Sequence, residues 1–486
     1  MQIAREQLSE ILGTSIPDSV TAVDAVTHDS RAVRAGGAFV AIPGFTVDGV
    51  TFVPQAMANG ASLVIAERDV PGAPTAVVPD ARVALADLAV EVAGHPSREL
   101  TVYGITGTNG KTTTSYVLHA ILSAAYGAEH TGLMTTAEIV VGSEREAAVR
   151  TTGEAPQVQG NLERMRAAGV THVVLETSSH GIHLHRVRGT RYAAALFTNL
   201  TRDHIDLHGS MEDYYLTKRR LFEWTDGPKL SNADDEYGAR LARDVPGTLT
   251  FGVVESADYR ISDARVEGAG TTFTLRTPEH GDLTLRTPLL GDYNVHNVAG
   301  AAAIALETGM DPDTLVRAVA EMAQVPGRFE RVPAAVDRGF EVVVDYAHTD
   351  VGLELVLQVA RDVLAAQDGD GRLICVYGAA GDRDPAKRPL MGAVASRLAD
   401  VAIVTTDDAY TEDPQAIADE VMAGADAGDT TVVLDRREAI RAALAQARPG
   451  DVVVVAGKGH ERVQHLPTGD VDFHDATVVT EELARA

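Results

Sequence analysis

The stretch LTVYGITGTNGKTTTSYVLHAIL, residues 100–122, decides the fold class. Its first residues are apolar and predict a buried strand, and the run after Lys111 predicts a helix. The glycine-rich turn between them exposes backbone N–H groups and a helix N-terminus, which together bind phosphate. The strict pattern G-x-x-x-x-G-K-[ST] requires a first glycine where Ile105 stands, so this loop is a variant. The stretch predicts an α/β nucleotide-binding domain; a tight turn without a ligand is the alternative.

Composition narrows the class of protein. A chain of 486 residues suits about three domains of ~150 residues. The net charge of −27 argues against nucleic acid or an anionic membrane as the main partner. No apolar run reaches the ~18–20 residues that a membrane span needs. The single cysteine, Cys375, cannot form an intramolecular disulfide, so we expect a cytoplasmic protein.

Two polar, proline-containing stretches predict domain boundaries: AGHPSREL (93–100) and AQVPGRFERV (323–332). We therefore expect an N-terminal domain at 1–98, a central domain at 99–325 and a C-terminal domain at 326–486. Alternating polarity in 249–288 predicts an antiparallel excursion from the central sheet.

The last domain repeats a strand followed by a polar loop. The segments are FEVVVDYAHT, RLICVYGAAGDRD, VAIVTTDDAY and DVVVVAGKGHE. Ligand sites of open α/β sheets lie beyond the carboxyl ends of the strands, so we expect all four loops at one edge.

Lysine is rare in this chain, and arginine carries most of the positive charge. The lysines are Lys111, Lys218, Lys229, Lys387 and Lys458. A lysine kept where arginine dominates is a candidate for chemistry that requires an amine, although chance is an alternative. We expect Lys111 to reach the β/γ-phosphates of a nucleotide. Lys218 lies on a predicted helix; it is either an ordinary surface lysine or an amine that takes up CO₂ as a carbamate and then binds a metal ion.

The segment VVLETSSHG (173–181) ends a second apolar strand with Glu176. In P-loop proteins an acid at that place completes the Mg²⁺ site together with the loop hydroxyl, here Thr112. A capping or ion-paired acid is the alternative. The nearby His180, His183 and His185 lack a trustworthy zinc spacing, so we expect them to face substrate or solvent.

Taken together, the motifs resemble one family, the Mur ligases, and within it the UDP-N-acetylmuramoyl-tripeptide synthetases of peptidoglycan synthesis. The matching segments are GTNGKTT, ETSSHG, FTNLTRDHIDLHG, GDYNVHNVAGAAA, PGRFE, VVDYAHT, GDRDPAKRPLM and AGKGHE, with HDSRAVRAGGAFVAIPGFTVDG near the N-terminus. They span all three predicted domains. Folylpolyglutamate synthetases share the P-loop but not this N-terminal part.

The resemblance implies an N-terminal UDP-binding domain, a central P-loop parallel-sheet domain and a Rossmann-like C-terminal domain. It implies an ATP-dependent amide ligase. This enzyme would phosphorylate the D-Glu carboxylate of UDP-N-acetylmuramoyl-L-alanyl-D-glutamate, and the amine of a free amino acid would then displace phosphate. Positioning and charge neutralisation carry such chemistry. We expect a monomer without nucleic-acid or membrane partners.

The resemblance also assigns residues, by position in this sequence. ATP would contact Gly107, Thr108, Asn109, Gly110, Lys111, Thr112, Thr113, Asn297, Arg328, Asp345 and His348. One Mg²⁺ would lie at Thr112 and Glu176, and a second at His204 and carbamylated Lys218. Lys111, Lys218 and His204 would be catalytic. The UDP-MurNAc-dipeptide would contact Ser30, Thr151, Thr152, Ser178 and Arg186, and the free amino acid Arg383, Asp407, Asp408, Tyr410, Gly457 and Glu461.

Departures from the family pattern affect the substrate loops. Gly153, Leu184 and Asp350 replace a common proline, glutamine and proline, which leaves details of the MurNAc-peptide contacts open. In members that add meso-diaminopimelate, an Asp-Asn-Pro-Arg loop supplies an arginine for the distal carboxylate.

The aligned residues here are Asp407, Asp408, Ala409 and Tyr410. An acid in place of an uncharged residue disfavours a carboxylate and suits an ammonium. We therefore predict L-lysine, or a shorter diamine such as L-ornithine, as the amino acid. Three alternatives remain: Arg383 or another basic residue supplies the missing contact and diaminopimelate is added, the protein is a P-loop kinase or NTPase, or it is a non-catalytic paralogue.

Overall fold

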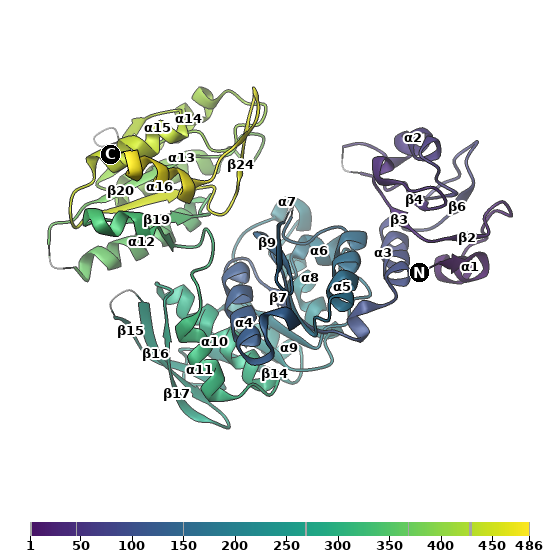
Figure 1. Cartoon of the computed structure of the whole chain (residues 1–486), viewed down its shortest axis with the longest axis horizontal. Helices are drawn as coiled ribbons and strands as arrows, with labels where there is room; N and C mark the ends of the chain where they lie inside the picture. Colours follow the sequence, from purple (N-terminus) through teal and green to yellow (C-terminus); the bar gives the residue numbers. More distant parts are fainter. Residues whose placement is uncertain are drawn as a thin grey trace. The chain divides into compact units, whose positions relative to one another are not determined.

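A computed structural model describes residues 2–44, 46–148, 150–267, 270–367, 369–426 and 430–485. The chain forms two compact units (Figure 1). The first comprises residues 1–264, 272–286 and 292–322, and the second comprises residues 265–271, 287–291 and 323–486. No helix in the described part is both long and apolar enough to cross a bilayer.

The first unit begins with a small parallel sheet. Its strands, in spatial order, are β3 (Val26–Thr27), β4 (Ala38–Val40), β5 (Leu63–Ala66) and β6 (Thr75–Val77). Helix α3 (Ala81–Ala93) packs on it, and α1 (Arg5–Leu12) and α2 (Val53–Ala58) lie nearby. The side chain of Asp80 accepts from the backbone N–H of Arg82 and starts α3, and Gly94 in the left-handed conformation ends it.

The rest of this unit is built on an 11-stranded sheet. In spatial order its strands are β10 (Glu144–Ala147), β9 (Glu138–Val141), β8 (Thr131–Met134), β11 (His172–Glu176), β7 (Thr101–Thr106), β12 (Ala194–Phe197), β13 (Lys229–Asn232), β14 (Thr248–Gly252), β15 (Tyr259–Glu267), β16 (Gly270–Thr277) and β17 (Gly281–Thr287). The strands from β8 to β15 pair in parallel, whereas β9 and β10 pair antiparallel.

Helices cover both faces of this sheet. On one face lie α4 (Lys111–Tyr126), α10 (Asp292–Glu307) and α11 (Pro312–Glu321), which pack against one another. The other face carries α5 (Ala155–Ala167), α6 (Ser179–His183), α8 (Met211–Trp224) and α9 (Glu236–Asp244), with the short α7 (Ile205–His208) beside α8. A core under these helices contains the fully buried Phe197, Tyr215 and Phe222. This arrangement is doubly wound and brings the carboxyl ends of β7, β11 and β12 to one edge.

The second unit holds a six-stranded sheet. In spatial order its strands are β18 (Glu330–Arg331), β19 (Glu341–Asp345), β23 (Val452–Ala456), β20 (Leu373–Tyr377), β21 (Val401–Val404) and β22 (Thr430–Val432). All pairs are parallel except β18 with β19. The helices are α12 (Asp350–Ala365), α13 (Lys387–Leu398), α14 (Pro414–Met422), α15 (Arg436–Gln446) and α16 (Asp475–Arg485). The hairpin β24 (Val463–Leu466) and β25 (Gly469–Asp472) follows β23.

Helices α12, α13 and α14 pack together, as do α15 and α16, and each group contacts the central strands of this sheet (Figure 1). The α/β class with parallel sheets is therefore confirmed. The antiparallel expectation is wrong for Thr248–Gly252, because β14 pairs in parallel with both β13 and β15. Helix α9 connects β13 to β14 as a crossover, and a crossover helix returns the chain in the same direction.

Candidate functional site

The loop between β7 and α4 has a backbone that only glycine tolerates. Gly110 has φ +82°, and a side chain there would collide with Oδ1 of Asn297 on α10. Gly107 has φ +150°, and a side chain there would collide with the Thr198 hydroxyl. Close packing from both sides holds the turn in one shape directly before the N-terminus of α4, a position that favours a bound phosphate.

Lys111 folds back over this loop. Its Nζ donates to the carbonyl oxygens of Gly107 (3.2 Å) and Thr108 (2.8 Å). Asn109 N–H donates to Oδ1 of Asn199 at 3.0 Å, which ties the loop to the end of β12. Such a preformed cradle with a lysine at its rim is the arrangement that phosphate binding requires.

Glu176 ends β11 next to the loop and is fully buried. Its Oε1 accepts from the Thr112 hydroxyl at 3.0 Å, and its Oε2 accepts from Thr136 N–H at 2.7 Å. A carboxylate and a hydroxyl held together beside a phosphate cradle are hard oxygen donors, which suit Mg²⁺. These residues therefore fit the first predicted metal site.

Lys218, on α8, is completely buried, and its Nζ donates to the Gly107 carbonyl oxygen at 2.7 Å. The Nζ also lies 4.7 Å from the ring centroid of Tyr214. Burial holds the pKa of Lys218 well below its usual range; Lys111 lowers it further and Asp203 opposes the shift. A neutral amine is the form that adds CO₂, so this environment suits carbamate formation.

His204 is the N-cap residue just before α7 and has a left-handed backbone at φ +53°. Its Nε2 lies 3.3 Å from Oδ2 of Asp203, and its ring meets His180 edge-on, with centroids 4.5 Å apart. Its ring centroid also lies 6.3 Å from that of Tyr214, the ring that Lys218 approaches. Across the described ranges, no three His, Cys, Asp or Glu side chains form a group able to hold a metal ion by themselves.

Four of the five residues predicted for the UDP-MurNAc-dipeptide gather near Glu176. The Thr152 hydroxyl donates to the Glu176 carbonyl at 2.8 Å and accepts from Ser178 N–H at 3.1 Å. Arg186 donates to the Thr152 carbonyl at 3.1 Å. Thr151 Oγ1 lies 2.9 Å from Oγ1 of Thr136.

Ser30 lies apart from these residues in the N-terminal sheet region, where its hydroxyl donates to Gln55 at 2.7 Å. The sequence reasoning missed Glu154, which pairs with Arg186 at 2.7 Å and with Arg150 at 2.8 Å. Burial lowers the pKa of Arg186, and Glu154 opposes that shift. Next to Glu154, Gly153 stands where the family commonly has proline. This difference was the one local sign that the loop departs from the family pattern.

The predicted ATP-binding residues of the second unit lie around the end of β19: Asp345 is its last residue, His348 follows it, and Arg328 precedes β18. Asp345 accepts from the N–H groups of Phe329 (2.7 Å) and Ala347 (2.8 Å), and burial raises its pKa. The His348 ring packs on Tyr346 with centroids 4.7 Å apart, and the Arg328 guanidinium lies 4.6 Å from the same ring. Burial lowers the pKa of His348. The structure thus brings these three predicted residues together around one tyrosine.

The residues predicted for the free amino acid lie on three neighbouring strand ends, after β20, β21 and β23. Asp407 and Asp408 are buried. Lys458, which carries no predicted role, has a fully buried side chain and donates to Asp408 Oδ1 and to Glu461 Oε2, both at 2.8 Å. A side chain on Gly457 would lie 2.5 Å from Oδ2 of Asp407. The acids therefore already hold an ammonium of the chain itself.

Tyr410 lies between two other side chains. Its ring stacks on His465 of β24 with centroids 5.1 Å apart, and the Arg383 guanidinium lies 5.2 Å from its centroid. Its backbone is left-handed at φ +49°. Another unassigned lysine, Lys387, donates to the His348 carbonyl at 2.9 Å, and burial lowers its pKa. The scarcity of lysine was the signal that pointed to Lys387 and Lys458.

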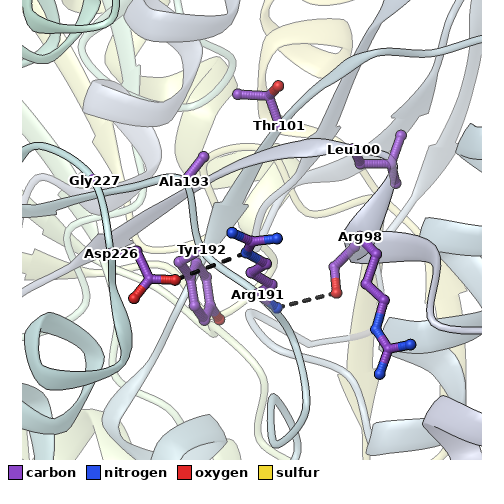
Figure 2. A pocket seen from close by; sticks show the side chains of 9 residues that line it. Arg98, Leu100, Thr101, Arg191, Tyr192, Ala193, Asp226 and Gly227 are labelled. Atoms are coloured by element: carbon purple, nitrogen blue, oxygen red, sulfur yellow. Dashed lines mark hydrogen bonds and ion pairs between the residues drawn. The ribbon is translucent and has the colours of Figure 1, made fainter.

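A separate pocket of about 330 Å³ lies at the amino end of β7 (Figure 2). Arg191 and Asp226 form an ion pair across it at 3.8 Å, and Tyr192 forms part of its wall. None of the predicted site residues lines it. The P-loop follows the opposite end of β7, so this pocket is distinct from the phosphate cradle.

Comparison with protein families gives three matches. The Mur ligase middle domain matches residues 105–305, the Mur ligase glutamate ligase domain matches 327–459, and the Mur ligase family catalytic domain matches 22–93. The matches follow the same order as the three sheets.

Curated relatives cover nearly the whole chain. The UDP-N-acetylmuramoyl-L-alanyl-D-glutamate--2,6-diaminopimelate ligase of Streptomyces coelicolor is 40% identical over 99% of this chain and 96% of its own length. The ligase of the same name from Geobacillus kaustophilus is 41% identical over 93% of each chain.

Solved structures agree in fold. One of a UDP-N-acetylmuramoyl-L-alanyl-D-glutamate--2,6-diaminopimelate ligase superposes with a TM-score of 0.67 and 32% identity, over 100% of this chain and 99% of the other. The MurF ligase of Thermotoga maritima in complex with ADP has a TM-score of 0.63 at 19% identity, over 97% of this chain and 100% of the other; this likeness concerns the fold alone.

Proposed function

Because the chain belongs to the Mur ligase family, we propose that this ATP-dependent ligase adds the third amino acid to UDP-N-acetylmuramoyl-L-alanyl-D-glutamate. One observation carries the proposal. A hydroxyl–carboxylate pair and a buried amine converge on the same glycine-rich loop. The Thr112 hydroxyl lies 3.0 Å from Glu176 Oε1 at the end of the loop, and Lys218 Nζ lies 2.7 Å from the Gly107 carbonyl oxygen within it. Names of relatives that align over nearly the full length support the substrate class.

The P-loop residues Gly107 to Thr113 would hold the ATP phosphates through N–H groups and Lys111. Mg²⁺, when bound, would neutralise phosphate charge at Thr112 and Glu176. His204 and a carbamate on Lys218 would provide nitrogen and oxygen donors for a second ion.

Asn297 is positioned by its contact with Thr114 at 3.2 Å. Arg328, Asp345 and His348 would bind nucleotide from the second unit.

The reaction balances without a redox partner. The D-Glu carboxylate oxygen attacks the γ-phosphorus, the bond from phosphorus to the β,γ-bridging oxygen breaks, and ADP leaves. The amine of the incoming amino acid then attacks the acyl carbon, loses a proton, and phosphate departs as the C–O bond breaks. The chain's main task is to orient three reactants and exclude water. Thr151, Thr152, Ser178, Arg186 and Ser30 would orient the UDP-MurNAc-dipeptide.

The names of the relatives favour 2,6-diaminopimelate over L-lysine as the amino acid, so the alternative is better supported than the lysine prediction. The lysine prediction relied on Asp408 and Glu461 being available to an ammonium, and Lys458 already occupies both. Arg383, close to Tyr410, offers a guanidinium for a distal carboxylate. L-Lysine remains a second candidate because Tyr410 stands where the resemblance places an arginine.

The test is phosphate release from ATP with UDP-N-acetylmuramoyl-L-alanyl-D-glutamate and each amino acid in turn, with product mass measured in parallel. We expect release to require the UDP-substrate and to be fastest with meso-diaminopimelate. Faster turnover with L-lysine or L-ornithine would reverse the amino-acid assignment and keep the ligase.

Phosphate release that ignores the UDP-substrate would indicate a kinase or NTPase, and no release with any amino acid would indicate a non-catalytic paralogue. The further expectations are a cytoplasmic location and a monomer, and size-exclusion chromatography with light scattering tests the latter.

A further inference from the structure

Three acids and one lysine form a buried charge cluster at the carboxyl ends of β21 and β23. Lys458 Nζ lies 2.8 Å from Asp408 Oδ1, 2.8 Å from Glu461 Oε2 and 4.0 Å from Asp407 Oδ1. The side chain of Lys458 is 0% exposed, whereas that of Glu461 is 33% exposed. The ammonium therefore lies beneath the acids, on the protein side of the loop cluster.

Neighbouring backbone segments position both Asp408 and Lys458. Asp408 Oδ1 also accepts from the backbone N–H of His465 at 2.9 Å, so the carboxylate is fixed between two donors. Lys458 lies in the glycine-rich turn after β23, next to Gly457 and Gly459, whose φ values are +120° and +53°. Burial lowers the pKa of Lys458, but Asp407, Glu461 and Asp408 outweigh it and raise the pKa, so the amine is an ammonium.

The charges lie next to the side chains that, under the proposed function, would face the amino-acid substrate. Tyr410 is two residues from Asp408 and stacks on His465, and Arg383 lies against Tyr410. A charge change at Asp408 or Lys458 therefore alters the electrostatic potential around Tyr410 and Arg383, where the end of the substrate side chain would bind. In a partly buried site with an effective dielectric constant of about 20, adding or removing one unit charge several Å away changes the dissociation constant of a charged ligand by about tenfold or more.

We propose that Lys458 is an internal counter-ion that determines specificity: it supplies the ammonium that Asp408 and Glu461 would otherwise take from the substrate, and so sets which side-chain terminus the site accepts. This inference rests on the proposed function and names a residue for it. Lys458 acts through the two acids and is a positioning residue rather than a catalytic one.

The proposal predicts changes of opposite sign. Lys458→Met leaves the acids unpaired, so the ratio of kcat/KM for L-lysine to kcat/KM for meso-diaminopimelate should rise by about tenfold or more. Asp408→Asn keeps the shape and the hydrogen bonds but leaves excess positive charge, so the same ratio should fall. The double variant Lys458→Met/Asp408→Asn should return toward the wild-type ratio. The effects should lie mainly in the KM of the amino acid, with a smaller change in kcat.

Lys229→Met is the matched control, because it removes a lysine from β13 in the other unit. It should leave the ratio unchanged. If Lys458→Met does not fold, Asp408→Asn alone still tests the proposal, which requires the lysine-to-diaminopimelate ratio of kcat/KM to fall. An unchanged or increased ratio in that variant overturns the proposal. Loss of kcat in both single variants with a constant ratio assigns Lys458 a structural role only and also overturns it. A wild-type chain that ligates no amino acid refutes the proposed function instead, so the two failures are distinguishable.

Discussion

At the residue scale, Lys218 is a fully buried lysine without a carboxylate in hydrogen-bond contact among the described residues. Its Nζ donates to the Gly107 carbonyl oxygen, and its electrostatic neighbours are Lys111 and Asp203. Burial of an unpaired amine costs several kcal/mol unless the amine is neutral. A neutral Lys218 amine avoids this free-energy cost, and the neutral amine is also the form that reacts with CO₂.

Lys218→Ala should lower kcat for ligation at least about a hundredfold, because the oxygen ligand formed from the amine is lost. Lys218→Arg should be equally impaired, since a guanidinium does not form the carbamate. High bicarbonate should not rescue Lys218→Arg, and a short carboxylate should partly restore Lys218→Ala. Steady-state phosphate release measures all three, and wild-type turnover in Lys218→Ala would refute the carbamate.

His119 in α4 predicts a pH dependence of stability. Burial, with help from Arg145, lowers its pKa from 6.5 to about 4. The unfolded chain binds a proton near pH 6.5 and the folded chain only near pH 4, so stability falls as the pH drops through this window. The loss should reach about 3 kcal/mol. His119→Gln should flatten the decline in the urea midpoint of the first unit, and His280→Gln, at an exposed site, should not.

At the element scale, the strand ends were predictable and the contacts between loops were not. An apolar run followed by polar residues located the loops after β19, β20, β21 and β23 correctly, because parallel strands place their carboxyl ends on one edge. The stacking of His465 on Tyr410 brings together a hairpin and a loop 55 residues apart in sequence, and no local pattern encodes it. The parallel pairing of β14 was not predicted, because alternating polarity is compatible with both parallel and antiparallel strands. The crossover helix α9 between β13 and β14 is the feature that indicates parallel pairing.

The turn between β7 and α4 should not tolerate a side chain. Gly110→Ala combines a left-handed φ of +82° with a collision against Asn297, so the KM for ATP should rise at least about tenfold. Gly169→Ala is a close control, with φ +83° and nothing within 4 Å of the added atom. It should cost about 1 kcal/mol of stability and leave the KM for ATP unchanged. Equal ATP kinetics in both variants would contradict the role assigned to the turn.

At the scale of the whole molecule, each of the two units has its own core and its own buried polar contacts. In the second unit, Arg436 and Asp475 form a bidentate pair at 2.7 and 2.8 Å with both side chains 0% exposed. Burial would lower the pKa of Arg436, but Asp475 raises it. In the first unit, the single tryptophan, Trp224, ends α8. Trp224 fluorescence therefore reports on the first unit alone, whereas far-UV circular dichroism reports on both units.

Asp475→Asn should destabilise the second unit by about 3–5 kcal/mol, because a buried guanidinium loses its counter-charge. Trp224 fluorescence should keep its wild-type urea midpoint, while far-UV circular dichroism should acquire an earlier transition. Asp472→Asn, an exposed site on β25, should change neither signal. A joint shift of fluorescence and circular dichroism would mean that the units unfold as one.

The burial of the lysines has a practical consequence. Lys218 and Lys458 are buried, and Lys111, Lys229 and Lys387 are only half-buried, so no lysine within the described ranges is exposed. Amine-reactive reagents therefore meet few side chains, and one of the more accessible, Lys111, lies at the phosphate cradle. Acylation of this residue should be slowed by bound ATP. Labelling with an N-hydroxysuccinimide ester followed by peptide mass mapping would thus measure nucleotide occupancy directly.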